Sequence, residues 1–194
     1  MNTQIISLSN QKGGVGKTTT CANLGIGLAR EGKRVLLVDC DPQASLTLSL
    51  GWRKPETLPV TLATLMGRAF QEQPVHAEEA ILHHAEGVDL IPGSIALSGV
   101  EASLDTRQNV LKRVLDDCRK DYSHVLLDCM PSLGMTTINA LAAADSVLIP
   151  TIPHYLSVDG LGKLMESIGR MRRGLNRGLR VEGILITMAS RTTY

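Results

Sequence analysis

The stretch that decides the fold reads Asn10-Gln11-Lys12-Gly13-Gly14-Val15-Gly16-Lys17-Thr18-Thr19-Thr20. It follows an apolar run, residues 5–8, and precedes a helix-like segment. A strand that feeds a glycine-rich turn opening a helix is the context in which such a loop holds nucleotide phosphates. The glycines allow consecutive backbone N–H groups to converge on an anion. The sequence therefore predicts a phosphate-binding loop.

One position departs from the common phosphate-loop spacing. The pattern Gly-x-x-x-x-Gly-Lys-Thr requires glycine at position 11, where this chain has Gln11, followed by a second lysine, Lys12. The other positions agree with the pattern, in which Lys17 reaches the β- and γ-phosphates and the Thr18 hydroxyl ligates Mg²⁺. Lys12 therefore decides which kind of phosphate loop this is.

Composition restricts the class of protein. Of the 194 residues, 43% are hydrophobic, 20% are charged and 3% are aromatic, and the formal net charge is +1. These values are ordinary for a soluble globular protein, and they give no global attraction to nucleic acid or membrane. The apolar runs are too short to span a bilayer, and no secretory signal is visible. The four cysteines lack metal-site spacing, so reduced thiols in a cytoplasmic protein of one domain, residues 1–194, are expected.

Short apolar runs alternate with helix-like stretches along the chain. The expected strands contain residues 5–8, 35–38, 88–91, 125–127, 147–149 and 184–186, and the expected helices are residues 18–31, 109–120, 132–143 and 158–173. The apolar runs do not alternate with polar residues, which is typical of strands covered on both faces. The pattern predicts an α/β fold, a doubly wound, mostly parallel sheet with helices on both faces. Residues 51–74 are the least regular and are expected to form a surface excursion with one short helix, 61–66.

Three aspartates follow predicted strands. Asp39 and Asp41 come after the second strand, and Asp128 comes after a later one. In open α/β sheets the ligand lies beyond the carboxyl ends of the strands. Phosphoryl transfer needs carboxylates that hold Mg²⁺ and a group that orients water. The alternative is that these aspartates only cap the helices that follow.

The chain resembles the ParA/MinD superfamily of ATPases, and specifically the ParA-type partition ATPases. The resemblance begins with the deviant Walker A loop, residues 12–18, preceded by Asn10-Gln11, and continues through Asp39-Cys40-Asp41-Pro42-Gln43. Further similar segments are residues 146–151, 156–160 and 183–188. The family usually has two prolines near residue 130, where this chain has Met130, so this loop is expected to be less stiff.

The resemblance implies a role for each motif residue. The nucleotide-binding residues are Lys12, Gly13, Gly14, Val15, Gly16, Lys17, Thr18 and Thr19. Thr18 is implied to ligate Mg²⁺ directly, while Asp39 and Asp128 support the metal through water or from the second layer. The implied catalytic residues are Lys12, Lys17 and Asp41, with Asp41 orienting the hydrolytic water. Lys12 is implied to reach the nucleotide of a partner subunit, and the sequence leaves open that it acts within its own subunit or lies in solvent.

The resemblance implies a dimerising ATPase that uses ATP and Mg²⁺ in plasmid or chromosome partition. It further implies an ATP-dependent homodimer, non-specific DNA binding, hydrolysis stimulated by a ParB-like centromere-binding protein, and a cytoplasmic or nucleoid location without membrane attachment. Two other functions remain open. One is a non-hydrolysing module that pairs with a full-length relative, because family chains usually continue beyond residue 194. The other is a MinD-like positioning ATPase, which would need a C-terminal amphipathic helix.

Two further groups of residues have alternative interpretations. The arginines at positions 170, 172, 173, 177 and 180 fit either a solvated helix C-terminus or a non-specific DNA contact. Cys40 and Cys129 follow the strand-end aspartates directly. Either they fill space in the core as small buried side chains, or they are thiols sensitive to oxidation beside the nucleotide. The last strand is expected to leave one face uncovered.

Overall fold

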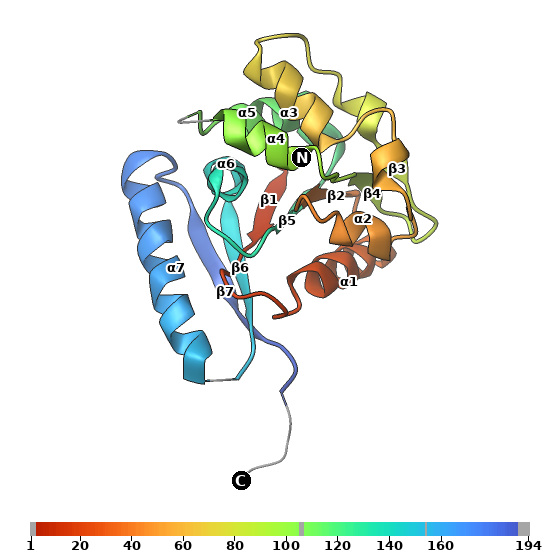
Figure 1. The fold of residues 1–194 in the computed structure, drawn as a ribbon. Coiled ribbons are helices and arrows are strands. Elements are labelled where there is room, and N and C mark those ends of the chain that lie inside the picture. The colour runs from red at the N-terminus through yellow and green to blue at the C-terminus, as the bar shows by residue number, and fades with distance from the viewer. Residues whose placement is uncertain (1–2, 105–106, 154, 190–194) are drawn as a thin grey trace.

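The computed structural model describes residues 3–104, 107–153 and 155–189 of the chain. Its centre is a seven-stranded sheet in the order β3-β4-β2-β5-β1-β6-β7 (Figure 1). The strands are β1 (Gln4–Leu8), β2 (Val35–Cys40), β3 (Leu82–His83), β4 (Asp89–Ile91), β5 (His124–Cys129), β6 (Ser146–Thr151) and β7 (Arg180–Ile186). All neighbouring pairs are parallel except β3 and β4. The predicted doubly wound, mostly parallel sheet is confirmed.

Helices cover the sheet on two sides (Figure 1). The helices are α1 (Lys17–Arg30), α2 (Ser45–Ser49), α3 (Leu62–Phe70), α4 (Leu97–Leu104), α5 (Val110–Cys118), α6 (Met135–Ala143) and α7 (Tyr155–Gly174). Short 3-10 turns lie at Pro55–Thr57, Ala77–Ala80 and Arg119–Asp121. Among the helices in the described ranges, none combines the length and apolar character that a membrane span requires.

The central strands are buried on both faces because their side chains pack alternately into two separate hydrophobic cores. Leu36 and Val38 of β2 join the larger cluster, which contains residues of α3, α4, α5, α6 and α7. Val35 and Leu37 of the same strand join the smaller cluster with α1 and α2. All six residues of β2 are buried, which explains why its sequence is nearly all apolar.

The strand order places the site. β1 lies between β5 and β6, and β5 lies between β1 and β2. Leu8 of β1 pairs with Asp128 of β5, which pairs with Asp39 of β2. Because these strands are parallel, the loops that follow them all emerge at one edge of the sheet. The phosphate loop and the strand-end aspartates therefore meet there.

Residues 51–74 differ from the expected surface excursion. Thr61 and Thr64 form a capping box that starts α3, a longer helix than the predicted 61–66. Leu62, Leu65 and Met66 are fully buried in the larger core. Their spacing places them on one helix face, so α3 forms part of the core, while most of residues 51–60 and all of residues 71–74 are exposed or half-buried as a surface excursion would be.

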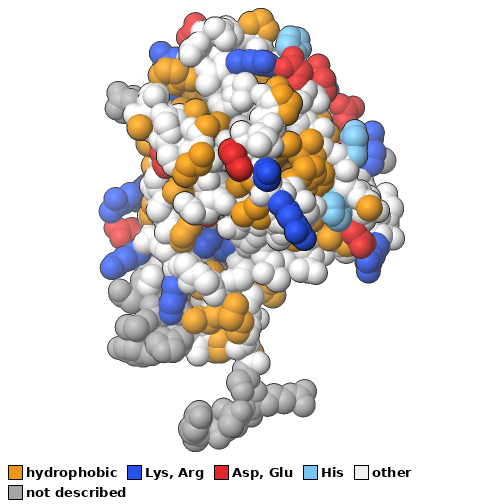
Figure 2. Space-filling view, turned by 45° about the vertical axis from the view of Figure 1, so that its right-hand side comes forward, with side chains coloured by type: hydrophobic (Ala, Val, Ile, Leu, Met, Phe, Trp, Pro, Cys, Tyr) orange, Lys and Arg blue, Asp and Glu red, His pale blue; other side chains and the backbone are white. Residues whose placement is uncertain are grey.

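β7 forms the far edge of the sheet, beside α7 at the left of Figure 1. The exposed fraction is 50% for Ile184 and 61% for Ile186. Figure 2 shows hydrophobic side chains gathered toward the lower end of the molecule, where β7 ends in Figure 1. Within the described residues, the predicted uncovered face on this strand is confirmed.

Candidate nucleotide site

The loop between β1 and α1 surrounds one end of a cavity of about 310 Å³. Gly16 precedes α1 with φ of 82°, a left-handed conformation that glycine adopts without steric cost. No side chain of the described residues caps α1, so the N–H groups of its first turn remain available to an anion. The cavity is lined by residues 13–19 together with Asp41, Ser45, Pro131 and Met188. The predicted phosphate-loop residues Gly13 to Thr19 therefore share one cavity with Asp41.

Asn10 fixes the start of the loop. Its side-chain Oδ1 accepts a hydrogen bond from the Lys12 backbone N–H at 3.0 Å, and its Nδ2 donates to the Pro150 carbonyl at 2.7 Å. The Asn10 side chain is buried, so these hydrogen bonds tie the loop to the end of β6. Lys12 itself is half-buried and does not line the cavity.

Lys17 is buried at the floor of the loop. Its Nζ donates a hydrogen bond to the Lys12 carbonyl at 3.2 Å. Burial lowers the pKa of Lys17, while the nearby charges of Asp128, Cys129 and Asp41 act in the opposite direction. A buried ammonium with one backbone partner is suited to hold additional anionic oxygens.

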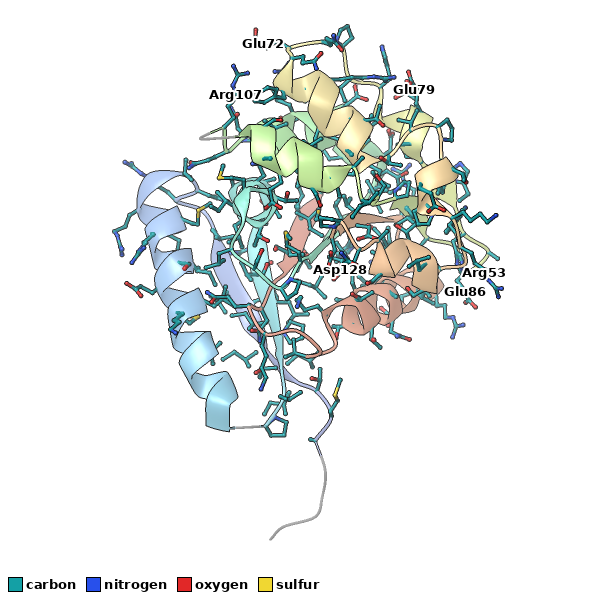
Figure 3. The ribbon with its side chains drawn as sticks, viewed as in Figure 1. Arg53, Glu72, Glu79, Glu86, Arg107 and Asp128 are labelled. Atoms are coloured by element: carbon teal, nitrogen blue, oxygen red, sulfur yellow. The ribbon has the colours of Figure 1, made fainter. Side chains whose placement is uncertain are left out.

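Asp128, at the end of β5, lies near the centre of the molecule (Figure 3). Both carboxylate oxygens are buried, and neither has a hydrogen-bonding partner of ordinary geometry among the described residues. Burial raises the pKa of Asp128 to about 7, although the Thr18 hydroxyl and the Lys17 charge favour the charged form. Buried carboxylate oxygens normally have partners, so these two are available to a ligand or its water shell.

Asp39 has the same strand-end position but a different environment. Its Oδ2 accepts hydrogen bonds from the Thr47 backbone N–H at 2.8 Å and from the Thr47 hydroxyl at 2.7 Å. Its Oδ1 accepts from the Asp41 backbone N–H at 3.2 Å. Burial raises the pKa of Asp39 to about 6, and the Thr47 and Asp41 hydrogen bonds oppose the shift. Asp39 therefore anchors α2 and the Asp41 backbone through these hydrogen bonds. Its predicted support of the metal stays a prediction.

Gly93 completes the support of Asp39. Its backbone N–H donates to the Thr47 hydroxyl at 3.0 Å. A Cβ at this position would lie 2.9 Å from the Asp39 side chain and 2.9 Å from the Asp41 carbonyl. Such a contact is shorter than real Cβ contacts, so only glycine fits here.

Asp41 lines the cavity and is half-exposed. Its Oδ1 accepts a hydrogen bond from the Gln43 backbone N–H at 2.9 Å. This turn holds the Asp41 carboxylate at the wall of the cavity that the phosphate loop also lines. The position suits a group that orients a water molecule, and that role stays a prediction.

The donor set fits Mg²⁺ shared with a nucleotide. The Thr18 hydroxyl in the cavity lining and the nearby Asp128 oxygens, to which no described residue donates a hydrogen bond of ordinary geometry, are hard oxygen donors. Among the described residues, no group of three or more His, Cys, Asp or Glu side chains has a metal-binding arrangement. Mg²⁺ commonly takes few protein ligands and completes its shell with phosphates and water. The residues present therefore suit a metal that arrives with phosphate.

The cysteines and arginines lie outside the cavity. Cys40 and Cys129 are buried, and desolvation raises the pKa of Cys40 well above its usual value and that of Cys129 to about 11. The buried-filler interpretation therefore accords with their positions. The five arginines at positions 170, 172, 173, 177 and 180 are exposed, at the end of α7 and the start of β7. Arg170 pairs with Glu166 at 2.8 Å.

Sequence reasoning missed three contributors to the site. Ser45 and Pro131 line the cavity, and Met188 reaches it from beyond β7. Met188 has φ of 52°, which is unusual for a residue with a side chain. The positions of Ser45 and Pro131 shortly after strand-end aspartates could have indicated their place in the site. Met188 follows the last strand, far from the loop in sequence, and no local pattern indicated it.

Comparison with known proteins agrees with this geometry. A family model described as an AAA domain matches residues 3–181. The sporulation initiation inhibitor protein Soj of Bacillus subtilis is 42% identical over 193 residues, 98% of this chain and 74% of Soj. The chromosome partitioning protein ParA of Caulobacter vibrioides is 40% identical over 193 residues, 97% of this chain and 70% of ParA.

A solved structure is also similar over the whole fold. It is described as cobyrinic acid a,c-diamide synthase from Mycobacterium smegmatis with bound ADP and magnesium. It has a TM-score of 0.92 and 38% sequence identity, and the match covers 99% of this chain and 77% of that one. With a cavity lined by the phosphate loop at the sheet edge and relatives along nearly its whole length, this chain belongs to the ParA-type partition ATPases.

Proposed function

We propose that this chain is a Mg²⁺-dependent ATPase that dimerises on ATP and acts in plasmid or chromosome partition. The observation that carries the proposal is the buried Asp128 carboxylate beside Lys17 and Thr18, to which no described residue donates a hydrogen bond of ordinary geometry. A buried polar group of this kind calls for an explanation, and a bound ion or its water shell is one that fits here. The M. smegmatis neighbour with bound ADP and magnesium supports this choice of ligand.

Each residue of the site has a proposed role that follows from its position. Lys17 and the N–H groups at the start of α1 bind the phosphates, while Thr18 and Asp128 hold the Mg²⁺ side of the site. Mg²⁺, when bound, neutralises charge that develops on the phosphoryl oxygens. Asp41 orients the attacking water from the opposite wall of the cavity. Asp39 acts through Thr47 and the Asp41 backbone rather than on the reacting atoms.

Lys12 is proposed to act on the nucleotide of a second subunit. Its backbone is fixed by Asn10, and its carbonyl accepts from Lys17, while its residue lies outside the lining of its own cavity. A cation supplied by a partner stabilises the transition state in the manner of an arginine finger, an effect of about 10³ to 10⁵ in rate. Opposed lysines also make closure of the dimer depend on ATP.

The cellular role extends this proposal. The similarity to the chromosome partitioning protein ParA supports partition as the process. A ParB-like protein is the proposed partner that stimulates hydrolysis. The exposed arginines near the end of α7 are the proposed non-specific DNA contact, whose affinity would fall steeply with salt. The name of the M. smegmatis protein refers to a different reaction, and no residue described here favours that reaction over ATP hydrolysis alone.

The deciding experiment measures oligomeric mass and turnover together. Wild type, Lys12→Ala and Asp41→Ala are compared with ADP, ATP and a slowly hydrolysed analogue, each with Mg²⁺. We expect ATP to dimerise wild type and to trap Asp41→Ala as a stable dimer without turnover, while Lys12→Ala stays monomeric. An Asp41→Ala protein that binds ATP but forms no dimer would refute the dimer mechanism. Zero turnover in wild type with intact Mg-ATP binding would favour the non-hydrolysing module.

A further inference from the structure

Thr187 connects the end of β7 to the phosphate loop. Its backbone N–H donates to the Thr151 carbonyl at 2.7 Å, which continues the β6–β7 pairing one residue beyond Ile186. Its hydroxyl lies 2.8 Å from the Val15 carbonyl oxygen and 3.0 Å from the Thr151 carbonyl oxygen. A threonine hydroxyl has one proton, which these two acceptors share. The Val15 contact is the shorter, and Thr151 already accepts the backbone N–H.

The Val15 carbonyl matters because of the peptide that it belongs to. Val15 is fully buried between Gly14 and Gly16, both of which have positive φ. The described peptide bonds are all trans, so the carbonyl of Val15 and the N–H of Gly16 point in opposite directions within one plane. A hydroxyl that holds the carbonyl on one side therefore fixes the direction of the N–H on the other.

The methyl group of Thr187 lies on the side of Gly16 where a Cβ would stand. A Cβ built on Gly16 would lie 3.6 Å from the Thr187 Cγ2 atom, which is ordinary van der Waals contact. The Thr187 hydroxyl thus contacts the loop, and its methyl group faces the space beside Gly16. The next residue, Met188, lines the cavity in which Gly16 lies.

We propose that Thr187 is a positioning residue of the nucleotide site, which holds the Val15–Gly16 peptide so that the Gly16 N–H is directed at a bound phosphate. The proposal rests on the proposed function in taking the ligand to be a nucleotide with phosphate groups. Thr187 does not touch the reacting atoms. It acts through the backbone of a loop 172 residues earlier in the chain.

The test compares three variants. Thr187→Val removes the hydroxyl with little change in shape, and Thr187→Ser keeps the hydroxyl but loses the methyl group. Thr151→Val is the matched control, because the Thr151 hydroxyl is buried on the adjacent strand without a hydrogen-bonding partner among the described residues. The dissociation constants of Mg-ADP and of a slowly hydrolysed Mg-ATP analogue are measured by calorimetry, together with the melting temperature of the nucleotide-free protein.

We expect Thr187→Val to weaken binding of both nucleotides about tenfold, the size of one typical hydrogen bond. Thr187→Ser should stay within about threefold of wild type, and Thr151→Val should bind as wild type does. Two results would overturn the proposal: wild-type affinity in Thr187→Val, or equal weakening in the Ser and Val variants. A lowered melting temperature with unchanged affinity would show a purely structural role, which also contradicts it.

These measurements separate this inference from the proposed function. Binding of a slowly hydrolysed analogue does not depend on turnover or on dimer formation. A wild type that binds but never hydrolyses ATP would contradict the proposed ATPase and leave the role of Thr187 testable. A wild type that binds no nucleotide would contradict both.

Discussion

The ends of β2 and β5 carry the same residue type in the same place but differ in chemistry. Asp39 and Asp128 are paired across neighbouring parallel strands, and both are buried. Asp39 accepts three protein hydrogen bonds, whereas Asp128 accepts none of ordinary geometry among the described residues. The fold supplies hydrogen-bonding partners to the first carboxylate, and the second is proposed to gain its partners from a ligand. A strand-end aspartate therefore has to be judged by its partners rather than by its position.

The difference originates in the segment that follows each strand. After β2 the chain enters α2, which places the Thr47 N–H and hydroxyl on Asp39. After β5 the chain continues through Pro131 to α6, and these residues supply no donor to Asp128. Four predictions test this contrast, in order of decreasing expected effect.

The largest effect is expected from Asp128→Asn. Loss of the carboxylate should lower ATP turnover by at least about 100-fold, because the charge opposite the metal is removed while the shape is kept. The dependence of ATP binding on Mg²⁺ should weaken as well. Turnover and binding are measured across a Mg²⁺ titration, with Asp39→Asn as the comparison. If Asp39→Asn loses Mg²⁺ dependence and Asp128→Asn keeps it, the assignment is reversed.

The second prediction concerns the partner of Asp39. Thr47→Val removes a hydroxyl that donates to Asp39 and accepts from Gly93, which leaves both groups short of a partner. The free energy of unfolding should fall by about 2 kcal/mol, measured by urea denaturation. Thr47→Ser keeps the hydroxyl and should lose less than half of that. Unchanged stability in Thr47→Val would mean that Asp39 does not depend on this contact.

The third prediction is a pH dependence. Burial raises the pKa of Asp128 to about 7 in the folded protein, above its ordinary value of 3.8. The folded state therefore holds a proton that the unfolded state releases, and stability of the nucleotide-free protein falls as the pH rises from about 4 to about 7. Asp128→Asn lacks this contribution, so its melting temperature relative to wild type should increase over that range. Glu166→Gln, which changes an exposed carboxylate of α7, is the control and should show no such trend.

The smallest effect is expected at the thiols that follow these aspartates. Cys40 and Cys129 are paired in register and buried, and burial raises the pKa of both. Alkylation of the folded protein should be slow and equal with and without ATP, because the reactive thiolate is scarce and enclosed. Mass spectrometry after brief labelling gives the rates, with urea-unfolded protein as the positive control. Faster labelling without ATP would instead support a thiol that senses the nucleotide.

The sequence was sufficient for the sheet and for the loop. Unbroken apolar runs predicted buried parallel strands, and the strand ends predicted the edge of the sheet at which Lys17 and Asp41 line one cavity. Asp128 lies beside Lys17 but is not among the residues that line this cavity, and the predicted roles of all three stay predictions. The packing of residues 61–70 into the core was missed, because irregular neighbours obscured a short helical face.

Contacts between distant segments could not be predicted. Thr47 reaches Asp39 only because α2 turns back over the strand end, and Gly93 arrives there from β4. Thr187 reaches Val15 across the sheet edge. Such contacts depend on side-chain geometry that no local pattern encodes.

The hydrogen bond from Lys17 to the Lys12 carbonyl affects the entropy of nucleotide binding. The Lys12 carbonyl oxygen accepts a hydrogen bond from the Lys17 ammonium group, as a phosphate oxygen would. This contact orients the ammonium group and stabilises the loop in the absence of a nucleotide. An incoming phosphate therefore exchanges one oxygen for another rather than ordering a flexible side chain. The loop loses its conformational entropy during folding, so this loss does not oppose the binding of a nucleotide to the preorganised loop.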